Sequence, residues 1–327
     1  EQLLLILACP MDKVDSGNIS SEDVRVVGLE GSTSWKGVEI AAVINRIITE
    51  KELDVKYILS DEGNNLVNAA KLLELPHLAD ISHLVATCLK KTFEDRADYK
   101  AFSTAVNKCQ AKLARGKYCY LRPPKQRVKA RFLNQEKVVN WAITIFDKWT
   151  QLEKVPKEKL ALMQPHKKIV GELSTCIKYA KVISKSLKIN GLNLVNIKEL
   201  ITNIKEQISE TKVKHKVQCT FLKYLKTYLE KYETFLKRKE FEGKTLHTCS
   251  DIIERLFGIY KAKVSDNYFV TTTTIGLELP LMCLSREELS NIIQPALEAT
   301  SMTDLKEWRS NQNSDNQSLM RLEFFKK

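Results

Sequence analysis

The first hundred residues combine short apolar runs with stretches of helical periodicity. Apolar runs predict four β-strands, at 3–11, 24–30, 55–60 and 78–82. Apolar residues three and four positions apart predict three helices between and after them, over 38–51, 66–75 and 84–93. Strands that alternate with helices through short connections are typical of an α/β domain built on one mixed sheet.

After residue 100 the pattern predicts helices almost exclusively. Long amphipathic stretches cover 101–115, 134–152, 157–187, 194–210 and 214–239. A further helix is predicted around Glu254, then an extended segment over 266–280 and two short helices over 286–299 and 303–309. No run approaches the roughly 18 to 20 apolar residues that a membrane span needs, so no membrane partner is expected.

The charge is concentrated in the middle of the chain. Residues 101–250 contain 32 Lys and Arg against 12 Asp and Glu, a net charge of +20, whereas the whole chain carries +12. Such an asymmetry favours a polyanionic partner, and nucleic acid is the simplest one, since its phosphates bind cations regardless of base sequence. A helical bundle with solvated lysine-rich faces is the alternative interpretation.

The 8 cysteines are scattered without a CxxC pair or a Cys/His cluster. This spacing is typical of reduced thiols in a cytoplasmic protein rather than of a zinc site or a disulfide framework.

Two acidic residues in distant segments suggest phosphodiester chemistry. Asp61 ends the apolar run 55–60 and precedes Gly63 and a helix, which places a carboxylate at the tip of a buried strand. Glu254 lies within an amphipathic helix, 193 residues later. A strand-tip Asp and a helix Glu could hold two divalent cations for an in-line displacement at phosphorus. The alternatives are an N-cap for Asp61 and a solvated helix position for Glu254.

Three further residues are candidate accessory groups. His83 follows the strand 78–82 and could contact the scissile phosphate or shuttle a proton, although a packed histidine is a common alternative. Asp80 could hold the same strand in place. Asp251 lies three residues before Glu254 and could be an N-cap or a supporting acid.

A basic loop with tyrosines is the strongest candidate for DNA contact. It is interrupted by Pro123 and Pro124 and lies between two predicted helices. Its cations could neutralise phosphates while its aromatic rings stack on exposed bases, or it could be an ordinary basic loop. The candidate residues are Tyr118, Tyr120, Arg122, Lys125, Arg127, Lys129 and Arg131.

Four motifs in this order give the chain a family resemblance. Ser-Asp-Glu-Gly-Asn at 60–64, Asp-Ile-Ser-His at 80–83, the Arg-Pro-Pro-Lys run from 122 and Ser-Asp-Ile-Ile-Glu at 250–254 together resemble the catalytic half of a DDE-type insertion-sequence transposase. The resemblance implies an α/β RNase H-like core, with a mixed sheet flanked by helices, interrupted by a large all-α basic insertion. Residues 1–100 and 246–327 would form the core, and 101–245 the DNA-contacting insertion.

The resemblance also assigns the two acids. Asp61 matches the second acid of the family and Glu254 the third, so both would ligate two Mg²⁺ (or Mn²⁺) ions. The first acid and its strand would lie upstream of residue 1, because Asp12 and Asp15 fall in a polar turn. The chain is therefore expected to be an N-terminally truncated fragment.

The expected function is that of a DNA transposase that cleaves DNA and transfers strands of a mobile element. Its partners would be double-stranded DNA, both element ends and target, bound by a homodimer, near the nucleoid if the cell is bacterial. The alternatives are an inactive or truncated transposase-derived DNA-binding protein and an RNase H-like nuclease. We expect Asp61 and Glu254 to share ions about 4 Å apart, with the basic loop facing them.

Overall fold

The structure is a computed structural model that describes residues 2–15, 19–126, 131–211, 216–264, 274–304 and 306–307. The chain divides into two compact units. Unit 1 contains Glu1–Asp80 and Lys244–Lys327, and unit 2 contains Ile81–Gly243.

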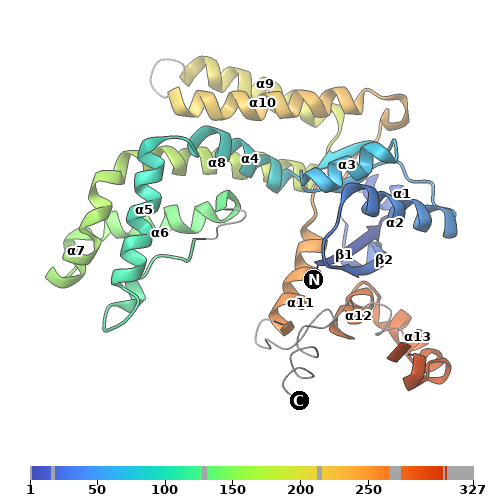
Figure 1. Cartoon of the computed structure of the whole chain (residues 1–327). Helices are drawn as coiled ribbons and strands as arrows, with labels where there is room; N and C mark the ends of the chain where they lie inside the picture. Colours follow the sequence, from blue (N-terminus) through green and yellow to red (C-terminus); the bar gives the residue numbers. More distant parts are fainter. Residues whose placement is uncertain are drawn as a thin grey trace, which may run out of the picture. The chain divides into compact units, whose positions relative to one another are not determined.

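Unit 1 is built from two distant parts of the chain (Figure 1). The first part contributes β1 (Gln2–Ala8), α1 (Met11–Asp15), β2 (Arg25–Ser32), α2 (Gly37–Glu50), β3 (Ile58–Ser60), α3 (Asn64–Leu72) and β4 (His77–Ala79). The second part contributes α11 (Asp251–Val264), α12 (Thr274–Leu281) and α13 (Arg286–Ala299). The region expected to be extended after residue 265 is therefore helical from Thr274 onward, and residues 265–273 lie outside the described part.

The antiparallel pair β1 and β2 separates two apolar clusters. Leu5, opposite Leu29 in the register, joins Val24 and residues of α11 and α12 in one cluster. Leu4 points to the other face and packs against α2 and α3. The two helices approach closely at Gly37, where a Cβ would lie 2.9 Å from the Cβ of Asn68. Alternate residues of β1 thus bury opposite faces, as strand geometry requires.

The second sheet is a short parallel pair, and it corrects the expected fold class. β3 and β4 have three residues each, with Ile58 opposite His77 and Ser60 opposite Ala79. Within the described residues, the chain forms two separate sheets of two strands each, and helices dominate the rest. The expectation of a large mixed sheet in an RNase H-like core is therefore wrong. The apolar runs predict strands, but they do not specify which strands pair.

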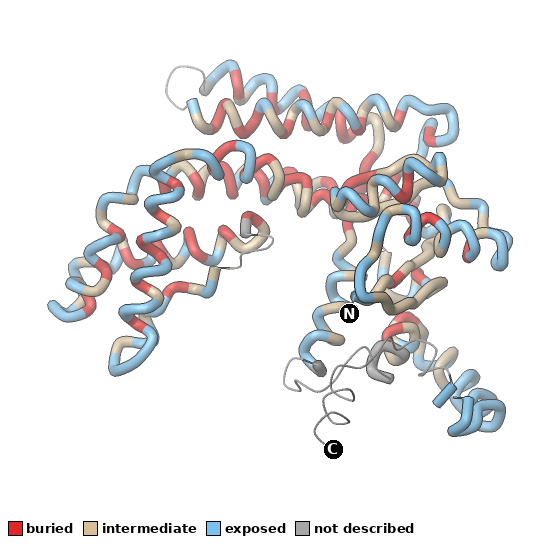
Figure 2. Tube along the Cα trace, viewed as in Figure 1, coloured by how far each residue is buried: buried red, intermediate tan, exposed pale blue. Residues whose placement is uncertain are grey.

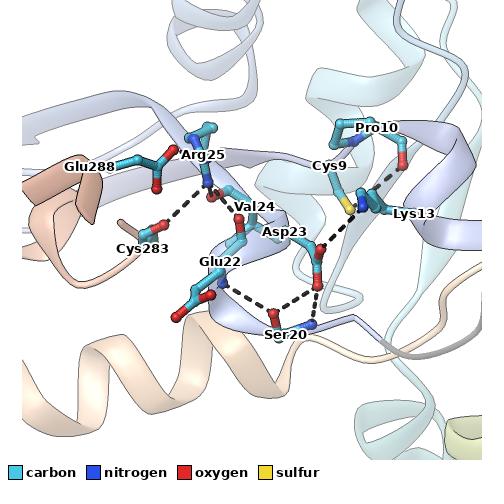
Figure 3. A network of polar contacts seen from close by, with 10 residues as sticks. All are labelled: Cys9, Pro10, Lys13, Ser20, Glu22, Asp23, Val24, Arg25, Cys283 and Glu288. Atoms are coloured by element: carbon cyan, nitrogen blue, oxygen red, sulfur yellow. Dashed lines mark hydrogen bonds and ion pairs between the residues drawn. The ribbon is translucent and has the colours of Figure 1, made fainter. Parts of the chain in front are cut away.

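A polar network connects the start of β2 to the start of α13 (Figure 3). The Arg25 guanidinium donates to the carbonyl oxygen of Cys283 at 3.3 Å and to the Glu288 carboxylate at 2.5 Å. Asp23 accepts from the backbone and hydroxyl of Ser20, and these bonds lower the pKa of its carboxyl. Arg25 thereby ties the first part of unit 1 to the segment that begins α13.

Unit 2 is helical throughout its described residues. Its α-helices are α4 (Ile81–Phe93), α5 (Ala97–Lys112), α6 (Gln135–Asp147), α7 (Lys154–Leu160), α8 (Lys167–Asn190), α9 (Leu194–Thr211) and α10 (Lys216–Leu236). Figure 2 shows buried positions recurring along these helices. In α10, Leu222, Leu225 and Leu229 are fully buried. In the described part of the chain, no helix is both long and apolar enough to cross a membrane.

Arg96 connects two helices of unit 2, and its removal should weaken the unit. Its guanidinium lies 2.6 Å from Asp98 at the start of α5 and 2.6 Å from Glu172 in α8. The hydrogen bond from Arg96 lowers the pKa of Asp98. We expect Arg96→Met to reduce the free energy of unfolding at pH 7 by about 1–2 kcal/mol, mostly through Glu172, because half-exposed Asp98 is screened by solvent.

The pH dependence of this effect follows from the sign of the Asp98 shift. A carboxyl whose folded-state pKa is lowered stabilises the fold above its unfolded pKa and loses that contribution as the pH falls through the folded value. The difference between wild type and Arg96→Met should therefore shrink below about pH 4 in urea unfolding. Lys100→Met is the control, since Lys100 pairs with an Asp95 that is fully exposed. Equal unfolding energies for the Arg96 and Lys100 variants at pH 7 would contradict the role given to Arg96.

Candidate functional site

Asp61 follows directly after β3, at the carboxyl end of the strand. Its Oδ1 accepts a hydrogen bond of 3.0 Å from the Gly63 amide, which forms a tight turn before α3. A Cβ at Gly63 would lie 2.9 Å from this oxygen and 2.9 Å from Oδ1 of Asn65, so a larger residue would require these side chains to move. The N-cap of α3 is Gly63 rather than Asp61. The turn uses one carboxylate oxygen of a partly exposed aspartate, and Oδ2 does not take part in it.

A Ser–His pair supports the end of the same strand. The Ser60 hydroxyl donates to the Asp61 carbonyl at 2.9 Å and lies 2.8 Å from Nε2 of His77, the first residue of β4. Because the hydroxyl proton is used in the first contact, Nε2 donates in the second. Burial lowers the pKa of His77, although nearby Glu62 and Asp61 oppose this effect. A neutral His77 therefore fixes the backbone that presents Asp61.

Asp80 is a fully buried carboxylate that joins this strand end to α11. Its backbone N–H donates to the Ser60 carbonyl at 2.8 Å, which extends the pairing of β3 and β4 by one residue. Its Oδ2 accepts from the Ser250 amide at 2.7 Å and from the Ser250 hydroxyl at 3.0 Å. Ser250 immediately precedes α11, and its carbonyl accepts the helical hydrogen bond of Glu254 N–H at 3.0 Å. Two residues that are 170 positions apart thus place the strand end and the helix start together.

A second contact holds the segment before α11. The Tyr57 hydroxyl accepts from the His247 amide at 3.2 Å and donates to the His247 carbonyl at 3.4 Å. Burial raises the pKa of Tyr57 to about 12, so the hydroxyl stays protonated and can make both bonds. Residues 247–250 are therefore attached at two points, through His247 to Tyr57 and through Ser250 to Asp80.

Glu254 lies in the first turn of α11, on the side that faces away from the apolar cluster. Ile252, Leu256 and Tyr260 of the same helix pack against β1 and β2, whereas Glu254 is exposed. Asp251 is the first residue of α11, so Ser250 and not Asp251 occupies the N-cap position. The two predicted acids thus belong to the same unit, on elements that Asp80 connects.

The other accessory candidate lies in unit 2. His83 is the third residue of α4 and is partly buried. The strand expected over 78–82 ends at Ala79, and a helix begins at Ile81.

No group of three or more His, Cys, Asp and Glu side chains within the described residues could hold a metal ion. Asp61 and Glu254 are nevertheless donors of the type that Mg²⁺ prefers, since this ion takes one or two protein carboxylates and completes its shell with water and substrate phosphate. Their chemistry fits the ion, and the shared metal site stays a prediction.

The described part of the basic loop is packed onto the helices of unit 2, while Arg122 and Lys125 are exposed. Pro123 is buried, and the Trp141 indole donates to the Leu121 carbonyl at 3.0 Å. Arg122 and Lys125 are exposed, as is Tyr120, of which 73% is accessible. Tyr118 instead donates to the Glu153 carboxylate at 2.6 Å, which raises the pKa of the phenol. Arg127, Lys129 and the side chain of Arg131 lie outside the described residues.

Of the residues that support Asp61 and Glu254, Asp80 was predicted from the sequence as an accessory group, whereas Ser250, Tyr57 and His77 were not. Ser250 carried a usable signal, because a serine directly before an amphipathic helix is a frequent N-cap. No local sequence pattern indicated the roles of Tyr57 and His77, since their contacts depend on the tertiary structure.

Comparison of the sequence with models of known protein families and with curated proteins finds no match.

Proposed function

We propose that this chain belongs to a DNA transposase, in which unit 2 holds the DNA backbone and Asp61 and Glu254 of unit 1 contribute to metal-dependent cleavage and strand transfer. The observation that carries the proposal is the buried link through Asp80. A fully buried carboxylate costs free energy unless it is hydrogen-bonded, and two donors of Ser250 meet Asp80 at the start of the distant helix. Its consequence is that Asp61 and Glu254 are held on connected elements.

The roles of the individual residues follow from their chemistry. Bound divalent cations would activate the attacking oxygen and stabilise the leaving oxygen. Asp61 and Glu254 would hold the cations, and Asp80, through Ser250, would fix the start of the helix that carries Glu254. The neutral His77 would keep Ser60 and the Asp61 backbone in place.

The charge of unit 2 supports its role in holding DNA. Ile81–Gly243 contains 35 Lys and Arg against 15 Asp and Glu, a net charge of +20, so the rest of the chain carries −8 of the total +12. An acidic site repels phosphate in the absence of cations, and a separate basic unit would offset this repulsion.

The first test is the salt dependence of DNA binding. Each lysine or arginine that neutralises a phosphate adds about 0.9 to the slope of log affinity against log salt concentration for duplex DNA. We expect Arg122→Gln combined with Lys125→Gln to weaken binding of a duplex and to reduce this slope by about 1.8. Fluorescence anisotropy at several salt concentrations would measure both quantities.

A matched control removes charge elsewhere on the same unit. Lys237 forms an ion pair of 2.8 Å with Glu233, four residues earlier, so Lys237→Gln should leave the slope nearly unchanged. If the wild-type chain does not bind duplex DNA at all, the proposal for unit 2 is wrong. If it binds with a slope that the loop substitutions do not alter, the loop is only a solvated surface.

A DNA-binding protein derived from a transposase but without cleavage activity is the second candidate. It is favoured by one observation, namely that the described residues hold no group of three candidate metal ligands. Nicking of duplex DNA by the complete protein in Mg²⁺, abolished by EDTA, would exclude it, and unchanged DNA in both conditions would support it.

A further inference from the structure

Two lysines from different helices converge on one tyrosine in unit 2. Nζ of Lys91, in α4, lies 5.0 Å from the centroid of the Tyr228 ring, in α10, and 3.0 Å from its hydroxyl oxygen. Nζ of Lys231 also lies 5.0 Å from the centroid of the same ring. The two ammonium groups are therefore at most about 10 Å apart, because neither can be farther from the other than the two centroid distances combined.

The helix geometry of α10 explains why these groups gather along one edge. Leu222, Leu225 and Leu229 are fully buried and form the inner face of the helix. Tyr224, Tyr228 and Lys231 recur at spacings of four and three, so they line one edge beside that face. Lys91 reaches this edge from α4 and lies 5.9 Å from the centroid of Tyr224 as well.

The contacts of Lys231 differ from those of nearby lysines in α10 and directly after it. Lys226 is paired with Glu230 at 2.7 Å, and Lys237 with Glu233 at 2.8 Å. Lys231 contacts an aromatic ring instead, and it has no carboxylate partner within the described residues. A ring positions an ammonium group without cancelling its charge. The charge of Lys231 is therefore available to a ligand, whereas those of Lys226 and Lys237 are partly compensated by a neighbouring carboxylate.

Tyr228 adds a donor between the two cations. Its hydroxyl oxygen accepts from Lys91, and a phenol can accept and donate at the same time. Its proton can thus be donated to an anionic oxygen. Two ammonium groups and one hydroxyl around one ring are donors of the kind that bind phosphate oxygens.

We propose that Lys91, Tyr228 and Lys231 form a binding site for backbone phosphates of DNA on the edge between α4 and α10, additional to the loop with Arg122 and Lys125. The inference rests on the proposed DNA-binding function of unit 2 and extends it to a second surface. The same edge of α10 continues toward Phe235, whose ring centroid lies 5.2 Å from the Arg238 guanidinium. The backbone of the DNA would run along α10 in that direction.

The test compares variants by the salt dependence of duplex binding. Lys91→Gln combined with Lys231→Gln should reduce the slope by about 1 to 2, one for each phosphate that is no longer neutralised, while the charge-conserving Lys91→Arg with Lys231→Arg should restore it. Lys237→Gln, one residue after the end of α10, is the control. Circular dichroism would verify that each variant is folded, as expected for exposed side chains.

A separate variant tests the role of the Tyr228 hydroxyl. Tyr228→Phe retains the ring and removes no charge, so it should weaken duplex binding by about tenfold at an unchanged slope. Unchanged slope in the double glutamine variant, with wild-type binding intact, would refute this site and leave the proposed function standing. Absence of wild-type binding would refute both. If Tyr228→Phe binds duplex DNA as tightly as the wild type does, the proposed role of the hydroxyl is wrong.

Discussion

Replacing Asp80 with alanine is expected to lower the free energy of unfolding by about 3 kcal/mol or more. Its carboxylate is completely buried and accepts two hydrogen bonds from Ser250. Hydrogen bonds to a charged group contribute about 1.5–3 kcal/mol each, and the alanine variant leaves the Ser250 donors without their acceptor. Urea unfolding monitored by circular dichroism would measure the loss.

Two further variants make this prediction specific. Asp80→Asn keeps one oxygen that can accept from Ser250, so it should lose less stability than the alanine variant. Asp54→Ala removes an exposed carboxylate that pairs with nearby Lys56 and should change the unfolding energy by less than about 0.5 kcal/mol. A stability of Asp80→Ala close to that of Asp54→Ala would mean that Asp80 does not hold α11.

Substitution of the two proposed metal ligands should have the largest effect on activity. In the complete protein, we expect Asp61→Asn and Glu254→Gln each to reduce DNA cleavage by about a thousandfold or more. The metal supplies several kcal/mol of transition-state stabilisation, and about 4 kcal/mol corresponds to three powers of ten in rate. DNA affinity should change little, because the cations of unit 2 provide most of it. A gel assay of cleavage and anisotropy on the same preparations would measure both.

The neighbouring carboxylate Glu62 provides the matched control. It is exposed, it follows Asp61 directly, and Glu62→Gln removes the same charge without removing the proposed ligand. Cleavage by Glu62→Gln should stay near the wild-type rate. If all three variants lose activity equally, general electrostatics and not metal ligation is responsible. If Asp61→Asn retains activity, the assignment of Asp61 is wrong.

Local features of the fold could be predicted from the sequence because they depend on periodicity. The alternation along β1 places Leu5 and Leu4 in clusters on opposite faces, and the spacing of apolar residues predicts α2 and α10. Strand pairing could not be predicted in this way. β1 pairs only with β2 and β3 only with β4 among the described residues, and an apolar run has the same pattern whichever strand lies beside it.

In the candidate site, too, local features could be predicted from the sequence and long-range contacts could not. Asp61 could be placed at the end of a strand because an apolar run, an acid, a glycine and a helical pattern follow one another in the chain. The link between Asp80 and Ser250 spans 170 residues, and the contact between Lys91 and Tyr228 spans 137. Neither residue pair has a local signal, since each depends on how distant segments pack. Asp80 could be predicted as an accessory residue, but its contact with Ser250 was found only in the structure.

The most direct test of the central claim, that Asp61 and Glu254 share one metal site, is cleavage of the polypeptide by bound iron. Fe²⁺ that occupies the site in place of Mg²⁺ generates hydroxyl radicals with ascorbate and peroxide, and these radicals cut the backbone next to the metal. We expect cuts near residue 61 and near residue 254 in the same sample, both suppressed by excess Mg²⁺ and both lost in Asp61→Asn. Cuts near only one of the two residues, or at other positions altogether, would contradict a shared site.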